Sequence, residues 1–353
     1  MYTIKGRGAI SNPSGRFEKT SREAFIDDWH SEEVAPSLDT ILLLDNAKSI
    51  ISHNDSPDLG FEQSINPYRG CEHGCIYCYA RPSHSYMNMS AGLDFETKIF
   101  YKPKAAELLE KELNKPSYIC KPIVLGANTD PYQPVEKQLK ITRSILEILN
   151  QYHHPVIVIT KGKLIERDLD LLGAMASRNL AKVAISLTTL SAELKQILEP
   201  RAASPQARLK VIADLNSAQI PIRVMVAPII PMINDGELEK ILETAKKAGA
   251  RQASYVLVRL PHEVKELFKE WLAKHFPDRA EHVMSLIRQM RGGKEYDARF
   301  GKRMHGEGEF AQLIAQRFLI ACKRFGMNET TKNNLDLHSF KKKPSIRQLT
   351  LFD

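Results

Sequence analysis

Three of the five cysteines in this chain lie within eight residues, at Cys71, Cys75 and Cys78, in a C-x3-C-x2-C spacing. Ionised thiols this close repel one another, and a bound cation offsets that repulsion. A structural zinc needs four protein ligands, usually including a second cysteine pair that this sequence lacks, so only His73 is left as the fourth ligand. A [4Fe–4S] cluster held by three thiolates leaves one iron open to another ligand. The spacing therefore favours an iron–sulfur cluster, with zinc as the alternative.

The composition indicates a globular protein. The chain has 353 residues, of which 43% are hydrophobic and 26% charged, and a net charge of +8. This excludes a disordered chain or a disulfide scaffold and leaves room for one large domain or two small ones. The longest apolar stretches, 155–159 and 224–230, are far shorter than the roughly 20 residues that span a bilayer. Residues 1–10 lack the apolar core of a secretory signal, so we expect a cytoplasmic location, no membrane contact and reduced cysteines.

Short β-branched runs alternate with amphipathic stretches of helical length along the middle of the chain. The predicted strands are 64–69, 122–127, 156–160, 183–188, 222–227 and 255–260. The predicted helices between them are 104–114, 137–151, 164–179, 205–218 and 237–248. Such alternation predicts an α/β fold with a parallel sheet, here a partial (β/α)6 barrel of the TIM type. No Gly-rich phosphate-binding motif follows a strand, which argues against a doubly wound sheet.

The remaining segments divide the chain further. Residues 1–60 are rich in Gly, Pro, Asn, Ser and Asp, and predict an irregular N-terminal arm with only a short helical pattern at 21–29. The predicted core barrel is 61–260. A C-terminal helical region, 261–327, follows, and a flexible basic tail, 328–353, ends the chain. Within the helical region three helices are predicted, at 263–275, 278–289 and 307–324, covering the open side of the barrel or its active site.

Polar residues follow several of the predicted strands. They are grouped at 126–134, 160–161, 186–188 and 199–201, and the cysteine loop itself directly follows the first strand. In barrels of this type the active site lies at the carboxyl ends of the strands. A polar side chain at one strand end more often caps the next helix, but several at one barrel mouth indicate a site.

The cysteine spacing, with the aromatic Tyr77 just before the last cysteine, resembles the signature of the radical S-adenosylmethionine (SAM) superfamily. The resemblance implies that the amine and carboxylate of SAM bind the open iron. It also implies that an electron from the reduced cluster splits SAM into methionine and a 5′-deoxyadenosyl radical, which removes a hydrogen atom from the substrate. In such enzymes the protein positions the cofactor and excludes water.

Within that superfamily, residues 60–260 resemble spore photoproduct lyase and related DNA-photolyase-like enzymes. The matching features are the tyrosines on both sides of Cys78, the Asn-Thr-Asp turn at 128–130, and the pairs 160–161 and 185–186. The resemblance implies SAM-binding roles for six residues: Asn128, Thr129, Lys161, Ser186, Glu199 and Arg201. Lys161 would pair with the SAM carboxylate, because a ligand carboxylate near a buried site needs a cation.

The likeness breaks at the hydrogen donor. Spore photoproduct lyases carry a cysteine just before this turn, whereas the equivalents here are Ala127 and Asn128. Cys120 lies about 20 Å away along the predicted strand and is expected in the core, as is the isolated Cys322. Tyr79 is the candidate catalytic residue, with hydrogen transfer, stacking on a base, or simple packing against the loop as its alternatives.

The end of the tail resembles the short peptide by which bacterial replication and repair proteins bind the sliding clamp. Its residues are Gln348, Leu349, Leu351 and Phe352. An extended tether presenting apolar side chains suits a hydrophobic groove, although the same residues could pack on the protein's own barrel. Residues 323–353 contain seven Lys and Arg against three Asp and Glu, and can contact phosphates or remain a solvated tail.

These features predict a radical SAM enzyme that acts on nucleic acid, in DNA repair or modification. An electron donor such as flavodoxin or ferredoxin is implied. Two alternatives stay open: the same chemistry on a peptide or small metabolite, and a non-catalytic iron–sulfur or zinc protein that binds DNA or relays electrons. The non-catalytic alternative predicts a metal centre without SAM cleavage.

Overall fold

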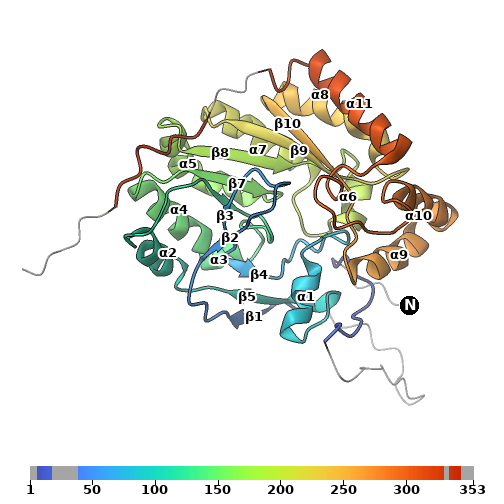
Figure 1. The fold of residues 1–353 in the computed structure, drawn as a ribbon, viewed down its shortest axis with the longest axis horizontal. Coiled ribbons are helices and arrows are strands. Elements are labelled where there is room, and N and C mark those ends of the chain that lie inside the picture. The colour runs from blue at the N-terminus through green and yellow to red at the C-terminus, as the bar shows by residue number, and fades with distance from the viewer. Residues whose placement is uncertain (1–5, 18–38, 330–333, 343–353) are drawn as a thin grey trace, which may run out of the picture.

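A seven-stranded sheet forms the centre of the computed structural model, which describes residues 6–17, 39–329 and 334–342 (Figure 1). The strand order is β10–β9–β8–β7–β6–β3–β2. All neighbours are parallel except β2 and β3. The strands are β2 Ile51–His53, β3 Gln63–Ile65, β6 Ile123–Leu125, β7 Val156–Thr160, β8 Ala181–Ser186, β9 Ile222–Ile229 and β10 Gln252–Leu257. Each of the six predicted strands therefore contributes to this sheet, in chain order, as a partial barrel requires.

A second, three-stranded sheet was not predicted. It has the order β1–β5–β4, with β1 Ile41–Leu44, β4 Tyr68–Arg69 and β5 Lys98–Tyr101. The first predicted strand, 64–69, is divided between the two sheets, because Pro67 has no N–H to donate to a ladder. The irregular N-terminal arm predicted at 1–60 contains two strands that were not predicted, β1 and β2. Both strands are too short to show a periodic pattern.

The helices follow the predicted alternation, with local breaks. They are α1 Leu93–Thr97, α2 Ala105–Leu113, α3 Glu136–Leu139, α4 Ile141–Gln151, α5 Leu169–Ala176, α6 Ala192–Leu198, α7 Pro205–Ser217, α8 Leu238–Ala248, α9 Val264–His275, α10 Ala280–Gln289 and α11 Gly308–Arg324. The predicted helix 137–151 is split at Lys140, whose φ is 54°. The short α6 was not predicted. None of the helices in the described ranges is long and apolar enough to cross a membrane.

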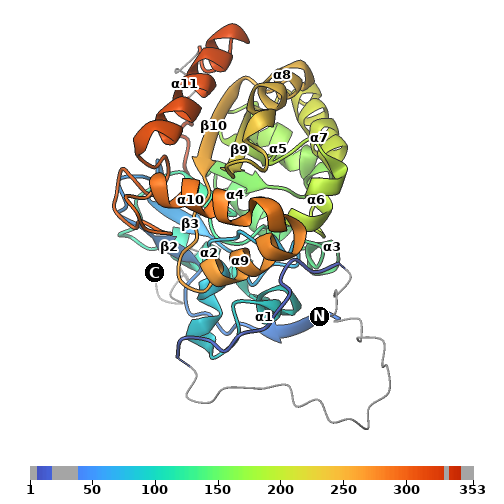
Figure 2. The ribbon, with the colours of Figure 1, turned by 90° about the vertical axis from the view of Figure 1, so that its right-hand side faces the viewer.

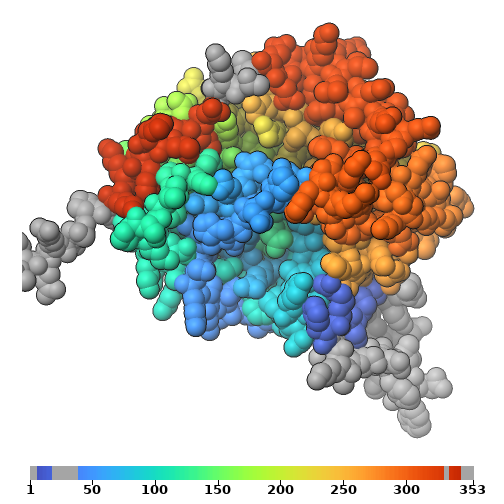
Figure 3. Space-filling model, viewed as in Figure 1, coloured from blue at the N-terminus to red at the C-terminus, as the bar shows by residue number. Residues whose placement is uncertain are grey.

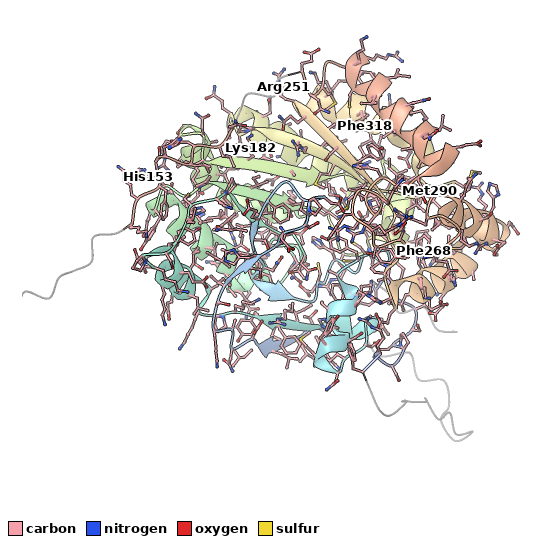
Figure 4. The ribbon with its side chains drawn as sticks, in the orientation of Figure 1. His153, Lys182, Arg251, Phe268, Met290 and Phe318 are labelled. Atoms are coloured by element: carbon pink, nitrogen blue, oxygen red, sulfur yellow. The ribbon has the colours of Figure 1, made fainter. Side chains whose placement is uncertain are left out.

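Helices cover the outer face of the parallel sheet, so its strands are largely buried. Helices α5, α7 and α8 pack against β8 and β9, and α11 packs on α8 and β10. Figure 2 looks toward the carboxyl ends of the strands, where α9 and α10 lie in front. Phe318 of α11 lies beside β10, as Figure 4 shows, with its ring 4.8 Å from that of Tyr255. The predicted C-terminal helices therefore cover one edge and one end of the sheet.

The sheet is open in its strand pairing, and polar contacts join its two edges. In the described part of the chain β10 pairs only with β9, and β2 only with β3. Asp58, in the loop after β2, accepts hydrogen bonds from Gly301 N and Arg303 Nε, both at 2.6 Å. Met304 O in turn accepts one from Leu257 N of β10 at 2.9 Å. These contacts, here called the edge clasp, bring the blue and orange segments together in Figure 3.

Part of the predicted flexible tail is docked at the end of the sheet where the parallel strands begin. His153, Lys182 and Arg251 mark this end in Figure 4. Asp336 N donates to Asn179 O, and Lys341 N donates to Tyr152 O, both at 2.9 Å. The Phe340 ring lies 5.6 Å from that of Tyr118 and 5.4 Å from that of His154. Residues 334–342 therefore differ from the predicted free tail. The helical pattern at 21–29 and the clamp-like peptide at 348–352 lie outside the described residues.

Candidate active site

The three clustered cysteines line one cavity of about 490 Å3 at the carboxyl ends of the parallel strands. Cys71 and Cys75 are buried and Cys78 is half-buried. Burial raises the pKa of Cys71 and of Cys78, and raises that of Cys75 to about 12. Negative charge on the neighbouring thiols raises the pKa of Cys71 further. Three such thiols ionise together only when a cation binds them, so this donor set fits a cationic metal cluster.

Buried backbone and ionic contacts fix the cysteine loop. Arg81 donates from Nε to Cys75 O at 2.9 Å and from Nη2 to Gly74 O at 3.2 Å. The same guanidinium forms an ion pair with Glu96 at 2.5 Å, and both side chains are fully buried. Glu96 also accepts hydrogen bonds from Gly8 N and from the next amide. The N-terminal segment around Gly8 is thus bound directly behind the loop.

The neighbourhood of His73 bears on the zinc alternative. Its Nδ1 lies 3.3 Å from Asp130 Oδ2, so this ring nitrogen already has a protein partner. Among the described residues no three His, Cys, Asp or Glu side chains are arranged to hold a single metal ion. A [4Fe–4S] cluster does not require that convergence, because each thiolate binds a different iron. The arrangement therefore fits the cluster better than zinc.

Four of the other predicted site residues lie in the cavity wall: Tyr79, Asn128, Lys161 and Ser186. Lys161 directly follows β7, and its Nζ is 6.0 Å from the centre of the Tyr77 ring. Ser186 ends β8 and donates from Oγ to Ala227 O at 3.1 Å. Successive strand ends thus bring these residues beside the thiols, as the alternation of strands and helices predicted. Their contacts with SAM stay a prediction.

Thr129, Glu199 and Arg201 lie outside the cavity wall. Thr129 is 1% exposed, and its hydroxyl donates to Tyr68 O at 2.8 Å. Arg201 donates from its backbone N to His73 O at 3.2 Å and from Nη2 to Glu72 Oε1 at 3.0 Å. Both residues bind backbone near the cysteine loop on the side away from the cavity. Their positions give no support to the predicted cofactor contacts.

Glu199 is also a support for the loop. It accepts hydrogen bonds from Tyr77 Oη, from Thr188 Oγ1 at 2.7 Å and from Arg208. Burial alone would raise the pKa of Glu199, but the positive charges of Arg208 and Lys161 lower it to about 2. The carboxylate is therefore ionised and fully used by its protein partners. Its place at the end of α6, a helix the sequence analysis missed, explains why it faces the loop and not the cavity.

Several cavity residues received no role in the sequence analysis: Asn66, Asp130, Phe61, Arg259 and Arg303. Asp130 accepts hydrogen bonds from Thr160 Oγ1 at 2.6 Å and Lys161 N at 2.7 Å, and so fixes the backbone of the lysine. Burial opposes its ionisation, yet the His73 ring and these donors lower its pKa to about 2. Asn66 and Arg259 lie within predicted strands, and this position is the sequence signal that could have identified them. Arg303 belongs to a loop that carried none.

Comparisons with known proteins agree with this geometry. Residues 65–245, just over half of the chain, match the radical SAM superfamily. An uncharacterized protein of Mycobacterium tuberculosis is 36% identical over 233 residues, which cover 65% of this chain and 68% of that protein. An uncharacterized protein of Methanocaldococcus jannaschii is 27% identical over 224 residues, covering 64% of this chain and 80% of its own.

Among solved structures, the fold is similar to that of spore photoproduct lyase. A variant of that enzyme with bound AdoMet and dinucleoside spore photoproduct has a TM-score of 0.57 at 15% identity. The match covers 81% of this chain and 80% of that chain. The cysteine triad at the mouth of a parallel, partly open barrel and the match over 65–245 lead to one conclusion: this chain belongs to the radical SAM superfamily, whose members bind a [4Fe–4S] cluster and SAM.

Proposed function

We propose that this radical SAM enzyme acts on nucleic acid. The observation that carries the proposal is an aromatic and cationic pair in the cavity wall, where the Arg259 guanidinium lies 4.9 Å from the centre of the Tyr79 ring. Unpaired bases are commonly bound by stacking on aromatic rings and guanidinium planes. The fold likeness to spore photoproduct lyase, whose structures hold a dinucleoside photoproduct, supports the same substrate class.

The chain's own residues prepare the cavity for this chemistry. When bound, the cluster supplies the electron that splits SAM and so provides a 5′-deoxyadenosyl radical for hydrogen abstraction. Lys161 offers the cation for the SAM carboxylate, and Asp130 holds its backbone in place. Apolar side chains such as Phe61 and Met225 line the rest of the wall and exclude water from the radical.

Tyr79 is the proposed catalytic residue. Its hydroxyl donates to Ala127 O, beside the position where the lyases carry their hydrogen-donating cysteine. The Tyr79 side chain is 44% exposed, and partial desolvation at the cavity raises its pKa, so the phenol keeps its proton at neutral pH. If Tyr79 returns a hydrogen atom to the substrate, Tyr79→Phe will still form 5′-deoxyadenosine but will lose deuterium transfer from D2O into product. Undiminished deuterium transfer would assign Tyr79 a stacking role only.

The substrate class is tested anaerobically with the reconstituted protein, dithionite and SAM. The 5′-deoxyadenosine formed is measured with irradiated DNA, with undamaged DNA and with none. We expect DNA to stimulate formation, with no product from Cys78→Ala, which lacks one predicted iron ligand. Product that is indifferent to DNA would favour a peptide or small metabolite as substrate. No product under any condition would favour the non-catalytic alternative.

The clamp-like peptide supplies a second, separate proposal, that the enzyme is recruited to DNA by a sliding clamp. Such tethering raises the local enzyme concentration without sequence readout. Leu351→Ala with Phe352→Ala should abolish clamp binding and leave SAM cleavage unchanged, whereas Thr350→Ala, at the residue just before them, should bind normally. Clamp binding by the double variant would remove the peptide from the proposal.

Electrons would come from a flavodoxin or a ferredoxin. This is tested by replacing dithionite with each of these proteins and measuring 5′-deoxyadenosine.

A further inference from the structure

We propose that Arg259 binds a phosphodiester group of the nucleic acid inside the cavity that contains the cluster thiols. The inference rests on the proposed function and deepens it, because it names the contact that positions the substrate. Arg259 lies just beyond the end of β10, in the sixth predicted strand, and its side chain forms part of the cavity wall. No role for it followed from the sequence.

The guanidinium of Arg259 has unused donors. Its Nε is buried and has no hydrogen-bond acceptor within the described residues. Its Nη1 donates only to the thioether sulfur of Met304, at 3.6 Å, and a thioether is a weak acceptor. Its Cζ also lies 4.9 Å from the centre of the Tyr79 ring, a contact that does not use the N–H donors. A buried donor without an acceptor is unfavourable, so a ligand that fills this position is strongly favoured.

Within the described residues Arg259 also lacks a direct ion pair, unlike its neighbour in the wall. Arg303 forms an ion pair with Asp58 at 2.6 Å, and the same carboxylate accepts from Gly301 N. Asp58 also attracts Arg259, but it does so from beyond ion-pair distance. Burial and the positive charge of Arg259 lower the pKa of Arg291 to about 10, and this buried guanidinium donates to the backbone oxygens of Lys302 and Val258. Arg259 therefore presents to the cavity a cation without a close carboxylate, a position that suits an anion.

A phosphodiester fits this position better than the carboxylate of SAM. Lys161, close to Tyr77 and the cluster loop, already provides a cation for that carboxylate. The flat edge of a guanidinium binds two oxygens of one phosphate at once, with a geometry that lysine cannot supply. A phosphate on Arg259 would also bring a neighbouring base toward Tyr79, in the combination of stacking and backbone contact that single-strand binding proteins use.

The test measures binding by the full-length, cluster-loaded protein with SAM present. The probe is a fluorescein-labelled single-stranded DNA octamer, and a series of octamers in which one phosphate at a time is replaced by a neutral methylphosphonate. Arg259→Gln is compared with the wild type and with Arg251→Gln, which removes an exposed arginine from the opposite end of β10. Cluster absorbance and SAM affinity confirm that each variant is intact.

We expect Arg259→Gln to weaken DNA binding about tenfold, in keeping with one lost charge-assisted contact. The slope of log affinity against log salt should fall by about one, and Arg251→Gln should match the wild type. One methylphosphonate should weaken wild-type binding and have no effect on Arg259→Gln. Equal sensitivity of both proteins at every linkage, or a loss of SAM affinity in Arg259→Gln, would overturn the inference. A wild type that binds no DNA at all would instead overturn the proposed function.

Discussion

Lys161 is the cavity residue whose position matches its predicted role most directly. It lies in the wall beside the thiols, and its backbone N is held by Asp130. We predict that Lys161→Met weakens SAM binding about tenfold or more, because the SAM carboxylate loses its cation, and leaves the cluster in place. Lys163→Met, two residues further along the chain and outside the cavity wall, is the control. Isothermal titration with SAM decides, and unchanged affinity in Lys161→Met would contradict the assignment.

The cysteines divide into two sets that one spectrum can separate. Replacing Cys71, Cys75 or Cys78 by Ala should abolish the absorbance near about 400 nm that is typical of [4Fe–4S] clusters. Cys120→Ala and Cys322→Ala should keep it, because neither lines the cavity. An intact cluster in any variant of the first set would refute that residue as a ligand.

Glu199 gives the protein a defined sensitivity to acid. Its pKa is near 4.5 in an unfolded chain and about 2 in the folded state, so its stabilisation is complete above pH 4.5 and is lost as the pH falls toward 2. We predict that the thermal unfolding midpoint of the cluster-free protein falls over this range. The fall should be shallower in Glu199→Gln, whose side chain does not titrate. Equal slopes in both proteins would show that other carboxylates control acid unfolding.

At the scale of elements, the cysteine loop that follows β4 depends on one buried ion pair, between Arg81 and Glu96. We predict that Arg81→Met lowers the free energy of unfolding by about 3 kcal/mol or more, because it leaves the Glu96 carboxylate buried and unpaired. Arg69→Met removes an exposed partner of Asp45 and should cost about 1 kcal/mol or less. Urea unfolding of the cluster-free proteins measures both. A small effect in Arg81→Met would mean that the loop is held mainly by its backbone.

Sequence periodicity predicted the parallel sheet because long buried strands and amphipathic helices have clear patterns. Strand β7 was predicted to the residue, and α7 to within one. The second sheet and α6 were missed, since their stability comes from tertiary contacts. The same limit applies to the site. The cysteine spacing identified the thiols, and the strand ends identified Lys161. Whether Thr129 and Glu199 face the cavity or the protein interior depends on contacts between distant segments, which the sequence does not show.

At the scale of the whole molecule, the docked segment 334–342 links the C-terminal part of the chain to the barrel. We predict that Phe340→Ala lowers the free energy of unfolding by about 1–2 kcal/mol, because it removes a half-buried ring from the cluster with Tyr118, Tyr152 and His154. Leu337→Ala, which truncates a side chain that is 39% exposed, should have a smaller effect. Denaturant unfolding checks both, and equal effects would argue against a specific aromatic contact.

The docked segment also determines on which side of the barrel the C-terminal part of the chain lies. Lys342, its last residue, donates from Nζ to Lys115 O at 2.7 Å, near the amino-terminal edge of the sheet. The cavity opens at the carboxyl ends of the strands, about 17 Å away along a five-residue strand. Lys342 therefore lies on the side of the barrel opposite the cavity, and a partner that binds there would leave the cavity mouth open. The enzyme could be carried along a surface while the side that meets substrate stays uncovered.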